Sequence, residues 1–475
     1  ESLTGPLTFI FNLALASSTF PSAFKSSYVR PIPKKGNSSD LLNFRPISIL
    51  SPFCKVFEQI LFDRIYWHVS SRLSPQQHGF VKKKSTLTNL LSFINDVDLS
   101  FSSRLQVDVI YLDFEKAFDK INHDILLAKL SSFNFHPSAL SFFASYLSDR
   151  LQYVRYKGHF SRPFHASSGV PQGSKLGPLL FFLAINDIVT VPLHSRLLLF
   201  ADDVKLYFRI SSLSDCLLLQ SDLNAISAWA TSNLFQINIS KSQFMSFTRR
   251  KSLFDFVYRV GDTPLTRVFQ INDLGVIFDP KLRFSIHIDA IIRKANQSLG
   301  FLLRNTVRLS DVDTLKMLYT AFVRSKLEYC SSIWYPNKAD SNRIERVQAR
   351  FVRILFFRLN GFYPSFPNQI SYQLLLSHTG LESLSARRIK HDLFFLHKLL
   401  NGSIHDCNLL EQVGLYVPYH NLRPQPRPLF SSNSLSPNTC LGRITNSFNS
   451  FNPALDIFSP FPAFKKSVVE TLEGF

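Results

Sequence analysis

The sequence is poor in cysteine and has no long apolar run. Its five cysteines lie far apart, with no pair at metal-ligand spacing, and an odd count does not suit a disulfide framework, which favours a reducing compartment. The longest candidate for a membrane span, residues 179–185, is far shorter than the roughly 20 apolar residues that a bilayer requires. We therefore expect a soluble, intracellular protein that binds no membrane.

The sequence also lacks a recognisable leader. The apolar stretch from Pro6 to Ala16 contains Asn12 and has no basic segment before it, so a core helix explains it better than a signal peptide. The first residue is Glu1 rather than Met. This predicts a fragment or a processed piece of a longer protein.

Acidic side chains are few relative to basic ones. Lys and Arg total 53 against 34 Asp and Glu, a formal net charge of +19. Such an excess favours a polyanionic partner, because binding releases counterions. Nucleic acid is the first candidate, although a merely soluble basic protein or one that binds an anionic membrane would carry the same excess. With 475 residues, of which 45% are hydrophobic, the chain has material for two or three packed subdomains.

The residue pattern changes from mixed to mostly helical along the chain. A basic, Pro-punctuated stretch from Pro31 to Leu50 predicts an exposed loop, or arm. The centre, to about residue 285, mixes strands and helices, whereas helical spacing dominates beyond Ile286. Residues His420 to Asn449 are rich in Pro, Ser and Asn, which predicts a linker before a last short helix around Phe464 to Leu472. We therefore expect an α+β fold followed by a helical domain.

Two central segments place carboxylates where strands end. Residues 107–112 are rich in β-branched and large apolar side chains, which predicts a strand that ends at Asp113. Two short apolar runs, residues 197–200 and 204–208, flank Asp202 and Asp203, the layout of a hairpin with carboxylates in its turn. Adjacent strands of one sheet would bring these carboxylates together.

Such a carboxylate cluster suits nucleotidyl transfer. That reaction uses two divalent ions about 4 Å apart, and magnesium prefers carboxylate oxygens. Without its context, an Asp pair such as Asp202 and Asp203 is better explained as a polar hairpin turn. The apolar run before the pair, however, would set unneutralised carboxylates against a core, which is costly unless cations bind there. We therefore predict a site for two Mg²⁺ ions, with Mn²⁺ as the alternative metal.

Seven motifs occur in the order found in reverse transcriptases. Three central ones resemble motifs A, B and C: YLDFEKAFDKINH (111–123), SSGVPQGSKLGPLLF (167–181) and LFADDVKLY (199–207). Four others resemble the flanking motifs: NFRPISIL (43–50), QHGFVKKKST (77–86), INISKSQFMSF (237–247) and DLGVIFD (273–279). The chain thus resembles the reverse transcriptases of non-LTR, LINE-type retrotransposons, particularly their Jockey-like branch.

The resemblance implies a right-hand polymerase whose fingers and palm contain antiparallel sheet. Fingers would occupy residues 1–105, a palm 106–285, and a helical thumb and extension 286–402, before the linker-like loop and short helix of 403–475. The whole reverse transcriptase domain would span about residues 14–282. RNA would be the template, deoxynucleotides the substrates, and a DNA primer or nicked target DNA the primer. A cytoplasmic ribonucleoprotein and the nucleus are the locations that the resemblance implies.

The resemblance also implies roles for residues near the predicted metal ions. Asp113 and Asp202 would be the principal metal ligands, with Asp203 as a supporting carboxylate. Lys241 would protonate the leaving pyrophosphate. The bulk of Phe118 beneath the sugar would exclude a 2′-hydroxyl and select deoxynucleotides, although an ordinary core Phe also fits this position.

Two further sets of residues would contact the substrates. Basic residues would face the triphosphate, Arg as a bidentate fork and Lys as a mobile point charge; these are Lys34, Lys35 and Arg45. Residues of the second motif would lie against the template and the incoming nucleotide, where glycine permits close backbone approach; these are Gly169, Gln172 and Gly173. Solvated charges and a plain turn are the alternative interpretations.

A row of arginines marks the helical region. Arg343, Arg346, Arg350 and Arg353 recur at helical spacing on one face, next to a face of apolar residues. The row predicts a groove for a duplex backbone, and its place after the polymerase core favours a thumb. A solvated basic face is the alternative.

The chain departs from the family pattern in places. Lys83 and Lys84 stand where the family often has Gly then Arg, which keeps the charge but loses the conformational freedom of glycine. No RNase H centre and no cysteine knuckle is apparent, and we expect an upstream endonuclease domain to be missing from this chain. The resemblance therefore implies an RNA-directed DNA polymerase. A catalytically inactive, RNA-binding remnant is the alternative.

Overall fold

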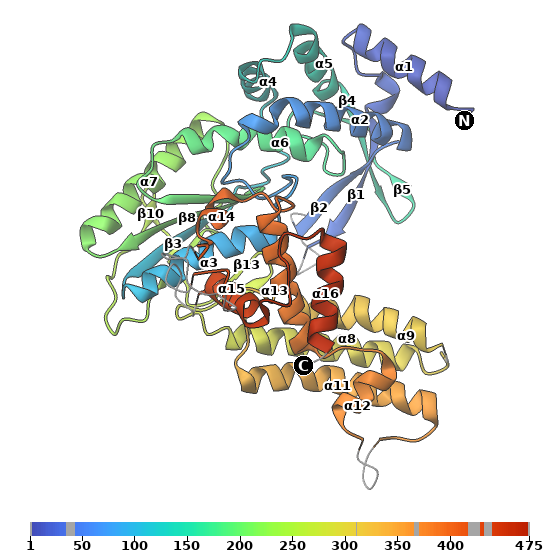
Figure 1. The fold of residues 1–475 in the computed structure, drawn as a ribbon. Coiled ribbons are helices and arrows are strands. Elements are labelled where there is room, and N and C mark those ends of the chain that lie inside the picture. The colour runs from blue at the N-terminus through green and yellow to red at the C-terminus, as the bar shows by residue number, and fades with distance from the viewer. Residues whose placement is uncertain are drawn as a thin grey trace.

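The computed structural model describes residues 2–34, 43–309, 311–364, 370–416, 428–431 and 439–473. These residues form an α+β fold with two five-stranded sheets, two small two-stranded sheets and many helices (Figure 1). Lys35, predicted to face the triphosphate, lies outside the described residues. Within them, no helix is both long and apolar enough to cross a bilayer.

One five-stranded sheet, here called the palm sheet because its strands lie in the range predicted for a palm, has the strand order β12-β9-β3-β8-β7. Its strands are β3 (Gln106–Leu112), β7 (Arg196–Phe200), β8 (Asp203–Ile210), β9 (Gln243–Phe247) and β12 (Thr266–Arg267). The central strand, β3, pairs antiparallel with both β8 and β9. Its apolar residues alternate between two cores: Val107 and Val109 lie in one, and Ile110 and Leu112 in the other. Burial on both faces explains why this strand is almost entirely apolar.

Helices cover both faces of the palm sheet. On one face lies α3 (Thr86–Ser102), whose Ser85 forms a capping box with Thr88. The core on the other face is built with helices from several parts of the chain: α2 (Pro52–Val69), α4 (His123–Ser132), α5 (Pro137–Leu147), α6 (Gly177–Ile185) and α7 (Leu213–Ser232). Pro137 is the first residue of α5, a position at which proline is favoured.

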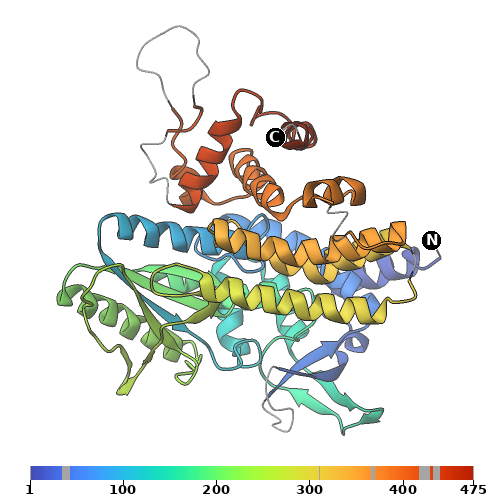
Figure 2. The same ribbon diagram turned by 90° about the horizontal axis from the view of Figure 1, so that it is seen from below.

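A second sheet, here called the fingers sheet, projects from the body of the molecule (Figures 1 and 2). It consists of β1 (Ser26–Pro33), β2 (Phe44–Ile49), β4 (Arg150–Tyr156), β5 (His159–Phe160) and β6 (Phe164–Ala166). Its order is β2-β1-β4-β5, with β6 also paired to β4.

The prediction of a loop from Pro31 to Leu50 is therefore wrong for the residues described there. They form the end of β1 and all of β2, which pair antiparallel from Tyr28–Ile49 to Pro33–Phe44. Prolines are tolerated because β4 pairs only with Ser26 to Val29 of β1, so the later part of β1 has one neighbour.

The first helix also differs in part from expectation. The predicted helix exists as α1 (Thr4–Ala16), but only Phe11 and Ala14 are buried in it, and Phe9 is 70% exposed. Phe11 stacks on Phe57 of α2, with 4.4 Å between ring centroids. The placement of this helix in the core is therefore wrong, because one edge of α1 packs and the rest faces outward.

Beyond the palm the chain is helical. The helices are α8 (Ser285–Asn305), α9 (Val312–Tyr319), the π-helical turn η5 (Thr320–Arg324), α10 (Ser325–Glu328), α11 (Lys338–Asn360), α12 (Tyr372–Thr379), α13 (Leu384–Leu400), α14 (Cys407–Glu411), α15 (Cys440–Phe451) and α16 (Phe461–Glu473). The long helices α8 and α11 run side by side (Figure 2). Many of these helices share one continuous core with α3 and the palm sheet.

One part of the predicted linker is wrong. Cys440 to Asn449 belong to α15, in which Leu441, Ile444 and Phe448 are fully buried. Their helical spacing is hidden among Ser, Asn and Gly residues, which produced the loop prediction. The expected final helix is confirmed as α16, while residues 420–427 and 432–438 lie outside the described residues.

Short elements complete the fold. They are η1 (Ser22–Phe24), η3 (Ser70–Arg72), η4 (Asn186–Thr190), β10 (Arg259–Val260), β11 (Thr263–Pro264), β13 (Ile271–Asp273) and β14 (Val276–Phe278). The motif at residues 273–279 contributes to a small antiparallel hairpin of β13 and β14. Buried Asp273 at its turn pairs with Lys205 of β8, with 2.7 Å between Nζ and Oδ2. This ion pair ties the small hairpin to the palm sheet.

Candidate active site

Strand register brings the predicted carboxylates to one end of the palm sheet. Leu112 of β3 is paired with Val204 of β8, so the next residue of one strand, Asp113, lies beside the first residues of the other. The turn between β7 and β8 contains Ala201 in the left-handed region and Asp202. The chain thus folds two distant segments into one carboxylate cluster, as the sequence predicts.

These carboxylates line a cavity of about 580 Å³ between the palm and fingers sheets. Predicted site residues from five segments of the chain line it together: Lys34, Arg45, Asp113, Phe118, Gln172, Asp202 and Lys241. Arg45 lies in β2 of the fingers sheet and Lys34 directly follows β1, so both reach the cavity from the side of the fingers sheet. The cavity therefore has an acidic wall and a basic wall.

Asp203 faces a different cavity from Asp202. It lines a neighbouring space of about 370 Å³, together with Asp113, Lys241 and the buried pair Lys205 and Asp273. Asp202 lies in the turn between β7 and β8, whereas Asp203 is the first residue of β8, so the two side chains border different cavities although they are neighbours in sequence. Asp113 borders both cavities.

The negative charge of the cluster is only partly compensated by cationic side chains. Burial and repulsion from Asp113 raise the pKa of Asp202, while Arg45 and Lys241 act in the opposite direction. Burial of its carboxyl group, together with repulsion from Asp202, Asp273 and Asp113, raises the pKa of Asp203 to about 7. Among the described residues, neither Asp202 nor Asp203 forms an ion pair, whereas Asp113 Oδ2 lies 3.5 Å from Lys241 Nζ. A bound cation would relieve this repulsion.

The donor set suits magnesium in the presence of a nucleotide. No group of three or more His, Cys, Asp or Glu side chains in the described part of the chain is placed to hold a metal by itself. Magnesium in phosphate-transfer sites is commonly held by one or two carboxylates, waters and the substrate phosphates. Asp113 and Asp202 supply such a pair, and their cavity is large enough for a nucleotide.

Phe118 is held firmly at the cavity wall. Its ring stacks on Phe181 of α6, with centroids 4.2 Å apart, and meets Phe80 edge-on at 6.4 Å. The ring is half-buried and also lines the nucleotide-sized cavity. Phe118 thus packs against the core and also lines the cavity, and its role in sugar selection stays a prediction.

The two predicted glycines have close neighbours in the chain itself. Gly169 has a φ of +78°, and a Cβ atom there would lie 2.6 Å from the Asp119 carbonyl oxygen. Gly173 has a φ of +116°, and a Cβ atom would lie 2.5 Å from the Ser48 carbonyl oxygen of β2. Gly173 therefore allows the palm to approach the fingers sheet. Contact of either glycine with nucleic acid stays a prediction.

Sequence reasoning missed Asp119. Its carboxylate accepts a hydrogen bond from Gln172 Nε2 at 2.8 Å, and both side chains line the cavity. Burial raises the pKa of Asp119, while Gln172, Lys116 and Lys34 lower it. The sequence signal that could have identified Asp119 is its position directly after Phe118 in the motif at residues 111–123. Asp119 fixes the orientation of Gln172 and adds a third carboxylate to the cavity.

The departure at Lys83 has a structural counterpart. Lys83 adopts a φ of +65°, the left-handed conformation that glycine would adopt at no cost. Its Nζ atom donates to the Gly402 carbonyl oxygen at 3.0 Å, and its own carbonyl accepts from the His405 amide at 3.1 Å. Lys83 therefore holds the segment after α13 against the turn before α3.

The arginine row lies along α11 and is not uniform. Arg346, Arg350 and Arg353 are exposed, and the neighbouring apolar face is buried in the core. Arg343 is also exposed, but its guanidinium group pairs with Asp340, at 2.9 Å, and with Asp289 of α8. The charge of Arg343 is therefore largely neutralised within the protein.

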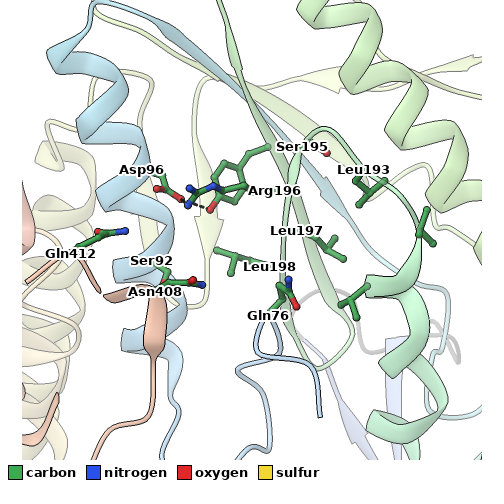
Figure 3. A pocket seen from close by; sticks show the side chains of 13 residues that line it. Gln76, Ser92, Asp96, Leu193, Ser195, Arg196, Leu197, Leu198, Asn408 and Gln412 are labelled. Carbon is green, nitrogen blue, oxygen red and sulfur yellow. Dashed lines mark hydrogen bonds and ion pairs between the residues drawn. The ribbon is translucent and has the colours of Figure 1, made fainter. Parts of the chain in front are cut away.

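A second cavity, of about 310 Å³, lies between α3, β7 and the region of α14 (Figure 3). Asp96 accepts there from Arg196 Nη1 and from the Tyr207 hydroxyl, both at 2.7 Å. Its buried carboxylate thus has one cationic partner and one neutral hydrogen-bond donor. This cavity differs in that respect from the one around Asp202.

Comparison with known families matches a model described as "Reverse transcriptase (RNA-dependent DNA polymerase)" to residues 32–294, more than half of the chain. A probable RNA-directed DNA polymerase from transposon BS of Drosophila melanogaster is 27% identical over 74% of this chain and 40% of its own length. The RNA-directed DNA polymerase from mobile element jockey of the same species is 28% identical over 73% of this chain and 39% of its length. The chain thus spans about 40% of the length of these relatives.

Among solved structures, apo telomerase from Candida tropicalis is similar with a TM-score of 0.38 and 11% sequence identity. The match covers 80% of this chain and 74% of that one. A likeness of this size supports no further conclusion.

Substitution of Gly173 tests its close approach to β2. Gly173→Ala would strain the backbone and place a methyl group against Ser48, so we expect a stability loss of about 1–3 kcal/mol and a lower midpoint of thermal unfolding. Gly300→Ala is the control, because Gly300 lies inside α8 with its nearest neighbour, Arg304 Nη1, at 3.4 Å. That change should leave the midpoint unchanged or raise it. Equal midpoints for both variants would contradict the packing role.

Proposed function

The chain belongs to the reverse transcriptase (RNA-dependent DNA polymerase) family, and from this we propose that it adds deoxynucleotides to a primer 3′-hydroxyl on an RNA template. The observation that carries the proposal is the convergence of Asp113 and Asp202 in one cavity, opposite Lys34 and Arg45. A triphosphate needs cationic groups on one side and metal-binding carboxylates on the other. This cavity offers both.

The metal chemistry belongs to Asp113 and Asp202. Two Mg²⁺ ions held there would activate the primer hydroxyl and stabilise the leaving oxygen. Mn²⁺, also an oxygen-preferring ion, is the alternative metal. Asp203 supports the site from the adjacent cavity, through its charge rather than by reaching the same space.

The surrounding residues would bind and orient the nucleotide. Lys34 and Arg45 bind the triphosphate from the fingers sheet, and Lys241, already next to Asp113, donates a proton to the leaving pyrophosphate. Phe118 lies beneath the sugar and leaves no room for a 2′-hydroxyl. Gln172, oriented by Asp119, contacts the template or the incoming base, with Gly169 and Gly173 shaping that wall.

The relatives indicate the biological setting of this reaction. Their names describe RNA-directed DNA polymerases of a transposon and a mobile element. We extend this to a non-LTR retrotransposon protein that copies element RNA from a DNA primer or nicked target DNA, within a ribonucleoprotein and in the nucleus. An endonuclease supplied by another part of the element protein would provide the nick. The helical region after Ser285 would act as the thumb.

A catalytically inactive, RNA-binding remnant of such a polymerase is the second candidate. The only partly compensated charge around Asp202 speaks against it, because a cluster without a metal-dependent role would gain stability by replacing one carboxylate. Binding of RNA without any primer extension would favour the remnant.

Extension of oligo(dT) on poly(A) with Mg²⁺ tests the metal-binding role. We expect Asp113→Ala and Asp202→Ala to reduce extension to background, and Asp203→Ala to reduce it partly, because Asp203 faces the neighbouring cavity. Asp313→Ala, at an exposed surface aspartate, is the matched control and should keep full activity. Wild-type rates for Asp202→Ala would refute the assignment.

The gate role of Phe118 is tested by sugar selection. Phe118→Val removes the ring edge from the cavity, so the ratio of ribonucleotide to deoxynucleotide incorporation should rise by about tenfold or more. Phe301→Val, at an exposed position of α8, controls for loss of a Phe elsewhere. An unchanged ratio in active Phe118→Val enzyme would show that another residue selects the sugar.

The arginine row is tested by the salt dependence of duplex binding. Replacing Arg346 and Arg350 together by Gln should lower the slope of log affinity against log salt by up to about 2, because two phosphate contacts are lost. Arg343→Gln should change the slope less, since Asp289 and Asp340 already neutralise that charge. Equal slopes for wild type and the double variant would identify the row as a solvated surface.

A further inference from the structure

The fingers sheet has two faces with different surroundings. Tyr28 of β1 is paired in register with Tyr153 of β4, and the next pair is Val29 with Val154. Both valines line the nucleotide-sized cavity. Because successive residues alternate between faces, the two tyrosines lie on the opposite face, here called the outer face.

Three aromatic rings gather on the outer face. Phe160 of β5 is paired with Arg155 of β4, which places it on the same face as Tyr153. The ring centroid of Tyr28 lies 5.5 Å from that of Phe160 and 6.3 Å from that of Tyr153. Tyr28 is 45% exposed and Phe160 is 55% exposed. Rings that are this accessible offer flat surfaces on which other planar groups can stack.

The charged side chains on the strands of this sheet are all basic. Its strands β1, β2, β4, β5 and β6 contain no Asp or Glu. Arg30 follows Tyr28 by two residues and therefore shares the outer face, and the Arg155 guanidinium lies 5.5 Å from the Phe160 centroid. Both arginines are exposed. A polyanion could approach the rings without meeting a carboxylate on these strands.

The position of the sheet leaves this face accessible. In Figures 1 and 2 the strands project from the body as a separate blade, and the cavity lies on the side toward the palm. Exposed aromatic rings flanked by arginines are the pattern by which proteins hold unpaired nucleic acid, with bases stacked on the rings and phosphates bound by the arginines. A protein partner would instead require acidic groups of its own to match Arg30 and Arg155.

We propose that the outer face of the fingers sheet is a second nucleic-acid site, which binds single-stranded RNA through stacking on Tyr28, Tyr153 and Phe160 and through the charges of Arg30 and Arg155. This site is separated from the nucleotide cavity by the thickness of the sheet. Only the choice of RNA as the ligand rests on the proposed function, because an enzyme that copies RNA must bind template that is not yet paired. The outer face would hold that unpaired strand outside the active site.

Anisotropy of a fluorescein-labelled oligouridine of about 12 nucleotides, with the full chain, tests the proposal. Tyr28→Leu combined with Phe160→Leu keeps apolar bulk but removes two stacking surfaces, so binding should weaken about tenfold or more. The matched control is Tyr156→Leu with Phe164→Leu, because these exposed aromatics lie on the opposite face of the same sheet. Its binding should stay near that of wild type.

Other outcomes would overturn the proposal. Unchanged oligouridine binding by the outer-face variant, or an equal loss in the control variant, would show that these rings do not form a specific site. A variant that binds RNA normally but changes its oligomeric state in gel filtration would identify the face as a protein interface.

A parallel measurement separates this site from the polymerase reaction. Asp202→Ala protein should bind oligouridine like wild type, because the cavity lies on the other face of the sheet. If neither the wild type nor any variant extends a primer, but Tyr28→Leu with Phe160→Leu still weakens oligouridine binding, the proposed function fails and the RNA site stands. If primer extension depends on Asp202 but the outer-face variant binds oligouridine normally, the proposed function stands and the RNA site fails.

Discussion

The antiparallel pairing of β3 with β8 is the constraint on which the rest of the structure depends. This pairing places the end of β3 beside the start of β8, so carboxylates from two distant segments of the chain meet at one end of the sheet. Such a meeting is unfavourable, because burial and mutual repulsion raise the pKa values of Asp202 and Asp203. The two cores on either side of β3 hold the strands in this register against that repulsion.

The charged side chains around these carboxylates differ in whether they have a partner. Lys205 and Asp273 form a buried pair below it, with 2.7 Å between Nζ and Oδ2, and so cancel one another. Arg45 and Lys241 oppose the shift at Asp202 without forming an ion pair with it in the part of the chain that the structure describes. The result is a site in which Asp273 and Asp113 have cationic partners, while Asp202 has no ion-pair partner among the described residues.

The central site could be predicted from sequence because its signals are local. Apolar runs on both sides of Asp202 define the hairpin, and the residues after Asp113 lie in one continuous motif. The failures arose where distant contacts decide the outcome. β2, which contains Pro46, is a strand because β1 pairs with it. α15 is a helix because Leu441, Ile444 and Phe448 are buried by other segments, and Arg343 is neutralised by Asp289 from another helix.

The core shared by the palm sheet and the C-terminal helices has an evolutionary consequence. The face of β3 that carries Val107 and Val109 is covered by the same apolar cluster that contains Trp334, Phe351 and Leu441. A recombination event that exchanged only the catalytic segment would leave this face in water and cut through α8, which begins before the end of the matched region. The catalytic segment and its helices should therefore be inherited as one unit, and substitutions in one should be accompanied by compensating changes in the other.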